Sequence, residues 1–576
     1  MKLRSFFYAL AAGTVALLAV AAVGFSWLTS QSPLNILRGG TVTNPTTTIF
    51  VPKQAPIMAS LLVNPDRLEA FRQLVARPAN RRRSRAELNQ IEESLLANTD
   101  INYRRDIQPW IGDEITFAVT SLDFDRNQEN AAQPGYLVAA TTKDAQKARE
   151  FLQLFYSKQA IAGTEDLVFE QYKGVNLTYK RPIAPIVGSN QTPTPPVWTS
   201  AVVGDRFVLF ANHPKVLRDA LNNVQAANLN LEDDPEYQQV LQSLNEPRIG
   251  FSFVNLPALA AWISNQPIPT QESFQASDTV AIALSLNSQG LLAQTALLGS
   301  QPSEQSQSPT LSMPVEALQY IPAESSLAIA GTDLNQFWNG LSTGRGDDDT
   351  LKSLLDQSIA SLQSRWGIQL PEDIFSWVQG EYALSLLPRP DRDNPDWIFV
   401  AEKVPGTTAE ESIEHLDAVA KQQGLSIGNL PLGDKTITAW TKLLTTSAIT
   451  GKDDSLLKLE AQVHGVHTAV GNYEVFTSSI EAMDEALQGL ENSLIKSDKF
   501  KNAIAPLPEQ NDGYLYLDWA QGETFIKRQL PIVQVVELVA KPLFDHLRSL
   551  SISSYGIDNG VQNSKLFFQL HNANES

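Results

Sequence analysis

Two versions of one stretch decide the fold: Ile107-Gln-Pro-Trp-Ile-Gly-Asp-Glu-Ile-Thr-Phe117 and Ile374-Phe-Ser-Trp-Val-Gln-Gly-Glu-Tyr-Ala-Leu384. Their tryptophans, Trp110 and Trp377, are 267 residues apart, and a glutamate follows each tryptophan at the fourth position. After the glutamate, apolar residues alternate with others in the way that is typical of a β-strand with one buried face. The pattern predicts a strand that begins at an anchored turn, and it predicts this element twice.

Four other segments repeat in the same order and at nearly the same spacing. The matches are Gly135–Ala140 with Asp396–Ala401 (offset 261), Val203–Phe210 with Val470–Thr477 (267), Ile249–Asn255 with Asp512–Asp518 (263), and a strand pair around Gly290 with one around Gly560 (270). Similarity at a fixed period indicates a repeated structural unit. We therefore expect a tandem duplication, with module 1 over residues 50–300, a polar linker over 301–314 and module 2 over 315–572.

The periodicity inside a module predicts the α+β class with a mainly antiparallel sheet and packed helices. Short alternating segments such as 57–63, 114–120 and 136–140 are typical of strands. Turn dipeptides at Lys173-Gly174 and Gly204-Asp205 predict hairpins. Helical spacing appears over 143–157 and 214–226, and a helical pattern also occurs over 87–96, so helices do not follow every strand. This arrangement favours an antiparallel sheet over a doubly wound parallel one.

The N-terminus is apolar from Phe6 to Leu28 and has no charge between Arg4 and Arg38. As a helix these residues would rise about 34 Å, which exceeds a hydrocarbon core of about 30 Å. We expect a transmembrane anchor over residues 1–28, with Lys2 keeping the N-terminus in the cytoplasm, and a flexible linker over 29–49. The alternative is a signal peptide cleaved near Ala21–Gly24.

Composition limits the function more than it defines it. The chain has 576 residues, a formal net charge of −19 and no cysteine. A strongly acidic chain lacks the positive field that nucleic-acid phosphates require, so we expect no nucleic-acid partner. Without cysteine there is neither a disulfide nor thiol chemistry. No motif for a cofactor, a phosphate loop or a nucleophile elbow occurs, so no cofactor and no catalytic residue are assigned.

Three acidic or histidine-containing motifs could carry chemistry, and each has a simpler interpretation. Glu114 and Glu381 could be acids that face each other in a shared cleft, but a turn anchored by the tryptophans explains them better. His464 and His467 could bind zinc, but on a strand residues three apart face opposite sides. The acidic loops 123–129, 391–396 and 347–349 lack the calcium-loop spacing and are interpreted as solvated loops. The Arg345-Gly-Asp347 triplet is short enough to occur by chance.

A basic patch is the one candidate contact site. It consists of Arg81, Arg82, Arg83 and Arg85, in a chain that is otherwise acidic. Such a patch could contact anionic lipid headgroups or an acidic partner, each arginine contributing about 1 kcal/mol near a charged surface. The alternative is a solvated loop that Glu87, Glu92 and Glu93 balance.

With its apolar N-terminus, its Trp-Ile-Gly-Asp-Glu114 and Trp-Val-Gln-Gly-Glu381 elements and its Val203-Gly-Asp-Arg-Phe207 hairpin, the chain resembles an uncharacterised family of cyanobacterial membrane-anchored proteins. The resemblance implies a plasma or thylakoid membrane, with the bulk of the chain in the periplasm or lumen. It supplies no site residues. We therefore expect a non-enzymatic interaction or scaffold protein with a protein partner. The alternative is an envelope hydrolase or a small-ligand-binding protein acting in the cleft between the modules.

Overall fold

A computed structural model describes most of the two predicted modules. The described residues are 43–64, 102–127, 132–161, 165–182, 197–226, 228–264, 279–287, 289–298, 311–335, 369–390, 392, 394–449, 455–529, 544 and 547–570. The predicted anchor at 1–28 lies outside these residues, as do most of the linker 29–49 and residues 301–310 of the second linker. No helix in the described ranges is long and apolar enough to cross a membrane.

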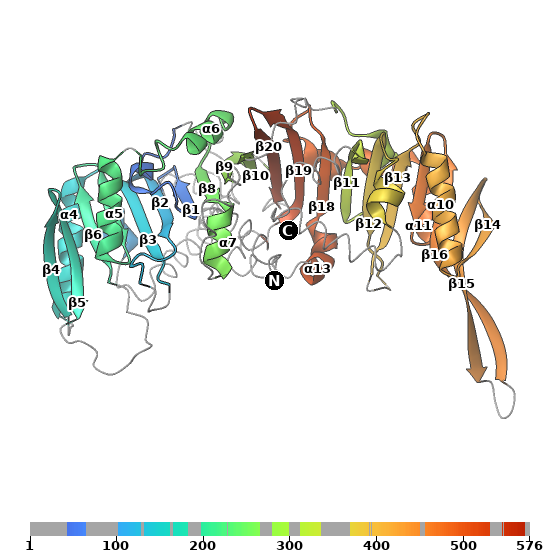
Figure 1. The fold of residues 1–576 in the computed structure, drawn as a ribbon, viewed down its shortest axis with the longest axis horizontal. Helices are drawn as coiled ribbons and strands as arrows, with labels where there is room; N and C mark the ends of the chain where they lie inside the picture. Colours follow the sequence, from blue (N-terminus) through green and yellow to red (C-terminus); the bar gives the residue numbers. More distant parts are fainter. Residues whose placement is uncertain are drawn as a thin grey trace, which may run out of the picture.

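One antiparallel sheet of 20 strands runs through the whole described chain (Figure 1). The first ten strands are β1 (Ile57–Leu61), β2 (Ile111–Ser121), β3 (Gly135–Thr142), β4 (Glu165–Tyr172), β5 (Val175–Pro182), β6 (Thr199–Val203), β7 (Phe207–Ala211), β8 (Gly250–Asn255), β9 (Thr279–Asn287) and β10 (Gly290–Leu298). The other ten are β11 (Leu327–Thr332), β12 (Glu381–Leu387), β13 (Asp396–Glu402), β14 (Ser426–Leu432), β15 (Lys435–Ile449), β16 (Ser455–Val470), β17 (Tyr473–Thr477), β18 (Gly513–Asp518), β19 (Leu547–Asp558) and β20 (Val561–Leu570).

The strand order is the same in the two halves, counted from the outer edge toward the middle. The N-terminal half runs β4-β5-β6-β7-β3-β2-β1-β8-β9-β10. The C-terminal half runs β14-β15-β16-β17-β13-β12-β11-β18-β19-β20. The prediction of an α+β fold with a large antiparallel sheet is confirmed. The expectation of one separate sheet per module is wrong, because the halves share a single sheet.

The two halves meet where β10 pairs with β20. Nine residue pairs form this antiparallel ladder, from Gly290 opposite Gln569 to Leu298 opposite Val561. Each strand of the pair also has a neighbour from its own half, β9 for β10 and β19 for β20. Neither strand is therefore an edge, and the backbone hydrogen bonds continue across the middle of the molecule.

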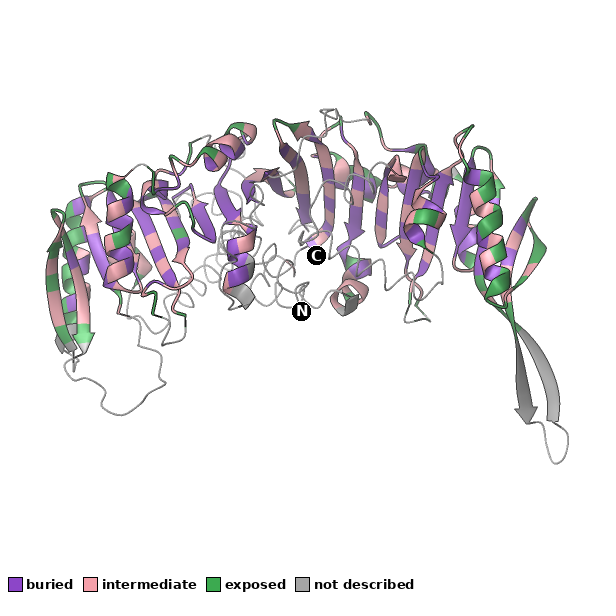
Figure 2. Ribbon diagram, in the orientation of Figure 1, coloured by how far each residue is buried: buried purple, intermediate pink, exposed green. Residues whose placement is uncertain are grey.

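Helices cover both faces of the sheet. They are α4 (Ala145–Ile161), α5 (Pro214–Gln225), α6 (Pro235–Ser243), α7 (Leu256–Ser264), α10 (Ala409–Gln422), α11 (Ile480–Leu487), α12 (Asp498–Ile504) and α13 (Trp519–Gln529). Successive residues of β3 show the two faces: Leu137 and Ala139 pack in the core beneath α5, whereas Ala140 packs with the α4 residues Ala148 and Leu152. The alternation of buried and partly buried residues along the strands is visible in Figure 2. Because the side chains of a strand alternate between the two faces of the sheet, α5 and α4 pack against different apolar residues of β3.

A single apolar core crosses the junction on one face. It joins Leu259 of α7 and Leu291 of β10 to Phe568 of β20 and Trp519 of α13. On the other face, Tyr237 of α6 packs with Ala296 of β10 and Val561 of β20 in a second core. The halves are thus held by side-chain packing on both faces as well as by the β10–β20 ladder. At about 25 cal/mol per Å² of buried apolar surface, such shared cores contribute strongly to stability.

Short one-turn helices precede strands β1, β2, β11 and β12 and helix α12. They are the 3-10 helices η1 (Thr47–Phe50), η4 (Glu316–Tyr320), η6 (Leu490–Asn492) and η7 (Leu494–Lys496), and the π-helical turns η2 (Tyr103–Ile107) and η5 (Leu370–Phe375). Thr47, Thr48 and Phe50 are fully buried. The last residues of the predicted linker 29–49 are therefore part of the fold, because their polar groups pair with a buried carboxylate of β2.

We predict that Gly290→Ala destabilises the junction by about 2 kcal/mol, because a Cβ at this position would overlap the carbonyl oxygen of Phe568 in β20. Thermal unfolding of the purified full-length chain measures the effect. Gly428→Ala in β14 is the matched control, since a Cβ there meets no atom within 4 Å. Equal unfolding temperatures for the two variants would contradict the close approach of β10 to β20.

Candidate functional site

A hollow of about 360 Å³ lies at the junction of the two halves, and we call it the junction pocket. Its lining comes from the end of α6 and the loop after it, from β10, from the segment after α12, and from β19 and β20. The lining residues are Gln242, Ser243, Asn245, Glu246, Gln294, Pro508, Tyr555, Asp558, Asn563 and Lys565. All but Pro508 carry polar side chains.

The floor of the junction pocket is the β10–β20 pair itself. Gln294 lies directly opposite Lys565, and Asn563 lies opposite Ala296, two residues further along. Directly opposed residues, and residues two apart on one strand, share a face of the sheet. The three polar side chains are therefore neighbours by register, and they lie on the face that α6 covers.

An ion pair and an aromatic ring form one wall. Lys565 Nζ lies 2.6 Å from Glu246 Oε1, which joins β20 to the loop after α6. Lys565 Nζ also lies 6.0 Å from the ring centre of Tyr555. A β-bulge in β19 between Ser554 and Ile557 positions Tyr555, whose hydroxyl accepts a hydrogen bond from Gln294 Nε2 at 2.8 Å. Burial raises the pKa of the Tyr555 hydroxyl, so it remains protonated at neutral pH.

Two oxygen atoms at the floor have no hydrogen-bond partner. They are Oε1 of Gln294 and Oδ1 of Asn563, and the two residues are only 6% and 7% exposed. A buried polar atom without a partner costs about 1–3 kcal/mol, so most buried polar groups in proteins are paired. Both atoms are also closed off from the hollow, because they have almost no accessible surface.

The sequence analysis could not locate this pocket. Gln294 is the one polar residue between Leu292 and Ala296 on its face of β10, whereas the facing side of β20 carries Asn563, Lys565 and Gln569. Neither local pattern indicates a pocket. Only the pairing of β10 with β20 brings them together from positions 269 residues apart in the sequence. The predicted contact residues Arg81, Arg82, Arg83 and Arg85 lie outside the described residues.

The two glutamates of the repeated stretch do not share a cleft. Nine strand steps separate β2 from β12 in the sheet, which corresponds to roughly 43 Å. Glu114 is buried and accepts hydrogen bonds from the backbone and hydroxyl groups of Thr46 and Thr47 at 2.6–2.9 Å. The acid-pair hypothesis is therefore wrong, because Glu114 fixes η1 to β2.

Glu381 has the same role in the other half. It accepts a hydrogen bond from the backbone N–H of Ala317 in η4 at 3.1 Å and from the Tyr473 hydroxyl at 2.9 Å. Burial and the Glu381 carboxylate both raise the pKa of Tyr473, since the phenol is needed as a donor. A carboxylate at the start of a helical turn accepts from N–H groups that would otherwise have no partner.

The tryptophans anchor the turns as predicted, by one hydrogen bond each. Trp110 Nε1 donates to the carbonyl of Asp106 at 2.7 Å, and Trp377 Nε1 donates to that of Asp373 at 3.0 Å. Both indole rings are buried. Glycine is required nearby for close packing, because a Cβ at Gly112 would collide with Thr141.

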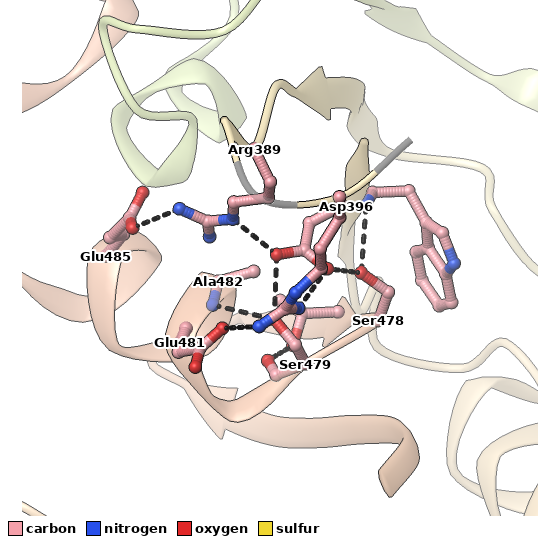
Figure 3. A network of polar contacts seen from close by, with 10 residues as sticks. Arg389, Asp396, Ser478, Ser479, Glu481, Ala482 and Glu485 are labelled. Atoms are coloured by element: carbon pink, nitrogen blue, oxygen red, sulfur yellow. Dashed lines mark hydrogen bonds and ion pairs between the residues drawn. The ribbon is translucent and has the colours of Figure 1, made fainter. Parts of the chain in front are cut away.

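One of the predicted acidic loops leads into a buried charge network (Figure 3). Asp396, 5% exposed, accepts hydrogen bonds from Arg389 Nε at 2.6 Å, Ser478 Oγ at 2.7 Å and Ser479 Oγ at 3.0 Å. Arg389 also pairs with Glu485 of α11 at 2.6 Å. Burial alone would raise the pKa of Asp396, but the hydrogen bonds together outweigh it and lower this pKa. The loop is thus fastened to α11, and only part of it is solvated.

The other acidic motifs lie partly within and partly outside the described residues. Asp123 accepts a hydrogen bond from the backbone of Gln133 at 3.2 Å, and burial raises the pKa of its carboxyl. Residues 128–129 of that loop, the carboxylates Asp391 and Asp393, and the segment 345–349 lie outside the described residues. Among the described side chains, no group of three or more histidines and carboxylates is arranged to hold a metal ion.

The histidine pair is on strand β16, and its two members have different environments. His464 is exposed and lies beside a register shift, whereas His467 is 6% exposed. The two ring nitrogens of His467 face Glu474 Oε1 at 2.7 Å and Asp417 Oδ1 at 3.3 Å. Trp440 Nε1 donates to the same Asp417 oxygen at 2.6 Å. This buried network connects β15, β16 and β17 to α10, and the sequence analysis did not foresee it.

Comparison with known proteins gives a family but no activity. The profile of the family described as "Protein of unknown function (DUF3352)" matches residues 10–570 of this chain. No curated protein matches. Among solved structures, crystal form I of TP0453 is similar, at 9% sequence identity and a TM-score of 0.23, over 44% of this chain and 78% of that chain.

We predict that Glu114→Ala lowers the free energy of unfolding by about 3 kcal/mol, because buried donors of Thr47 lose their acceptor. Glu381→Ala is expected to cost about 1–2 kcal/mol, since it removes fewer hydrogen bonds. Urea unfolding of the full-length chain measures both. An unchanged stability for Glu114→Ala would mean that the carboxylate does not hold η1 in place.

We predict that Asp396→Asn costs about 3 kcal/mol at pH 7, because Arg389 keeps its burial and loses its strongest partner. The folded-state pKa of Asp396 is lowered, so its stabilisation is fully present above the unfolded carboxyl pKa near 4 and is lost as the pH falls through the folded value. The stability difference between wild type and variant should therefore shrink below about pH 4.

The control for this variant is Asp205→Asn, at an ion pair with Arg149 in which the two side chains are 86% and 51% exposed. It should change stability by less than about 0.5 kcal/mol. Chemical unfolding between pH 7 and pH 3 gives both values. A difference for Asp396→Asn that stays constant with pH would contradict the assigned role of the carboxylate.

Proposed function

This chain belongs to the DUF3352 family of proteins of unknown function, and we propose that it is a membrane-tethered, non-enzymatic interaction protein. The apolar run Phe6–Leu28 supports the tether, and Lys2 and Arg4 before it favour a cytoplasmic N-terminus. In this proposal the sheet lies in the periplasm or thylakoid lumen, next to a plasma or thylakoid membrane. The sheet is a rigid scaffold, because its backbone pairing is unbroken from β4 to β14.

We also propose that the chain arose by tandem duplication. The identical strand orders of the two halves support this, as does the pairing of β10 with its counterpart β20. With an offset of 270 residues, Gln294 corresponds to Ser564 and Thr295 to Lys565. The ladder pairs Gln294 with Lys565 and Thr295 with Ser564. Replacing each residue by its counterpart in the other half therefore converts one pair into the other. Self-complementary pairing of this kind is what a two-fold relation between equal units produces.

Exposed apolar side chains at the outer end of the N-terminal half carry the interaction proposal. Leu154 of α4, Phe169 of β4 and Trp198 just before β6 are 58%, 72% and 55% exposed. Phe169 lies opposite Thr178, which lies opposite Ser200, and Trp198 is two residues from Ser200, so both aromatic residues are on one face. Helix α4 contacts β4 and β6 on this face. We call these three residues the outer apolar patch.

The outer apolar patch adjoins an open sheet edge. Strand β4 pairs only with β5 within the described residues, so its other side offers unpaired N–H and C=O groups. An extended partner segment could add to this edge and cover Phe169 at the same time, a common mode of protein recognition. The opposite edge, β14, is less suited to this role, since Pro431 lacks an N–H.

A second candidate function is binding of a small polar ligand, which the junction pocket favours. The other alternative, an envelope hydrolase, is less well supported. The described lining offers Ser243 and Glu246, but its described residues include no histidine that could activate a serine.

We predict that Phe169→Ser with Trp198→Ser reduces recovery of the protein partner at least tenfold in affinity purification from solubilised membranes. Each large apolar side chain buried in an interface contributes about 1.5–3 kcal/mol, and a loss of about 1.4 kcal/mol is tenfold in affinity. Met313→Ser is the matched control, because Met313 is 73% exposed but lies outside the outer apolar patch.

A photo-crosslinking residue at position 169 tests the contact directly. It should crosslink to the partner that the wild-type chain recovers, and a crosslinking residue at position 313 should not. Equal recovery by the double variant and the wild type, with no crosslink from position 169, would rule out the outer apolar patch as the contact. The anchor-deleted chain serves as the control for the tether.

A further inference from the structure

We propose that the chain pairs with a second copy of itself through the free edge of a projecting β-hairpin. The hairpin, which we call the arm, consists of residues 442–449 of β15 and 455–462 of β16. This inference goes beyond the interaction proposed above and does not depend on it, because the outer apolar patch lies at the other end of the sheet. It rests on the register of the arm, the sequence along its β15 edge and the exposure of Leu443.

The arm leaves the sheet because its neighbouring strands stop. Strand β14 pairs with β15 only as far as Thr441, and β17 pairs with β16 only from Val466 onward. Past these points β15 and β16 form eight further pairs with each other, the last being Ile449 opposite Ser455. At about 3.4 Å per residue the arm is about 27 Å long. Figure 1 shows it running on past the ends of the other strands. Within the described residues, neither edge of the arm has a third strand.

The root of the arm is fastened to helix α10. A β-bulge between Trp440 and Thr441 separates the arm from the rest of β15, and bulges bend a strand and increase its twist. The Trp440 ring lies against Gly465 of β16, where a Cβ would meet the indole. Trp440 Nε1 donates a hydrogen bond to Asp417 Oδ1 of α10 at 2.6 Å. A strand that is held at its root loses less freedom when its edge binds a partner.

The β15 edge of the arm lacks the features that keep edges apart. From Leu443 to Ile449 the sequence is Leu-Leu-Thr-Thr-Ser-Ala-Ile, without charge, proline or glycine. Natural proteins protect open edges with charged residues or proline. Two nearby edges follow this rule, since β14 contains Pro431 and the β16 side of the arm contains Lys458 and Glu460. The β15 edge is therefore suited to the addition of a strand.

The same stretch is complementary to itself in antiparallel order. When Thr446 lies on a two-fold axis, it faces its own counterpart in the second copy. The other pairs that result are Leu443–Ile449, Leu444–Ala448 and Thr445–Ser447. Apolar residues then meet apolar residues and hydroxyls meet hydroxyls, which are stabilising cross-strand pairs, and no like charges face each other. In such a contact the same surface serves both copies.

A second copy also supplies what the isolated arm lacks. Leu443 is 56% exposed, and in the pair it stands next to Ile449 of the second copy. A two-stranded hairpin by itself is marginally stable in water, whereas two paired arms form four strands. The same kind of contact already joins the halves of one chain, where β10 pairs antiparallel with its counterpart β20.

Disulfide trapping tests the geometry, because the chain has no cysteine of its own. Directly opposed residues of an antiparallel pair have Cα atoms about 4.5–5.5 Å apart, within the range of a disulfide. Thr446→Cys in the detergent-solubilised full-length chain should therefore give a linked dimer under mild oxidation. Leu459→Cys is the matched control on the other edge of the arm, opposite Thr445, and should stay unlinked. No linkage from position 446, or equal linkage from position 459, would overturn the inference.

Sedimentation velocity of the same solubilised chain measures the dimer without a covalent link. The wild-type chain should sediment as a dimer, and Thr446→Lys should weaken the dimer roughly fivefold or more, because two like charges then face each other across the axis. Gln462→Lys, at an exposed residue on the β16 edge, is the matched control and should leave the dimer unchanged. A monomeric wild type, or a dimer that Thr446→Lys does not weaken, contradicts pairing through this edge.

A mixture of opposite charges separates lost pairing from lost folding. Thr446→Glu alone should weaken the dimer as Thr446→Lys does. An equimolar mixture of the two variants should recover the dimer, since the two charges that meet on the axis are then opposite. Damaged folding would not be rescued by mixing, so a mixture that stays monomeric would overturn the assignment of Thr446 to the axis.

Discussion

The antiparallel pairing of β10 with β20 is the contact on which the rest of the molecule depends. An unpaired strand edge is prone to wrong pairing, and each half in isolation would have a second open edge, at β10 or β20, besides its outer edge at β4 or β14. Pairing β10 with β20 removes these two inner edges and brings the apolar positions of α7 and α13 into one core. The same pairing produces the junction pocket, because it sets Gln294 opposite Lys565. Scaffold and candidate site therefore have one origin.

Buried charge in this protein serves mainly to fasten segments that lie outside the sheet. Glu114 holds η1, Glu381 holds η4, and Asp396 holds Arg389 against α11. Glu114 and Asp396 accept hydrogen bonds on both carboxylate oxygens, and Glu381 accepts two on one oxygen. The junction pocket differs in this respect, since its buried amide oxygens have no protein donor.

The two ends of the sheet are not equivalent, although the strand orders are. The N-terminal end has exposed aromatic residues next to the open edge of β4, whereas the edge strand β14 at the C-terminal end contains Pro431 and the exposed Leu430. The middle of the sheet, where both halves contribute side chains, is a second region that neither half can form alone.

The sequence by itself determined the local elements, because these depend on short-range periodicity. The alternation in β2 and β12, the hairpin turn at Lys173-Gly174, and the helix that begins at Pro214 follow from residues near one another in the chain. The anchoring of Trp110 and Trp377 was also predictable, since a buried indole needs an acceptor and the turn before it supplies one. Tertiary structure alone decided that the halves share one sheet, that Glu114 and Glu381 are far apart, and that Gln294 meets Lys565 and Asn563. Such contacts join residues hundreds of positions apart, and no local pattern encodes which strand pairs with which.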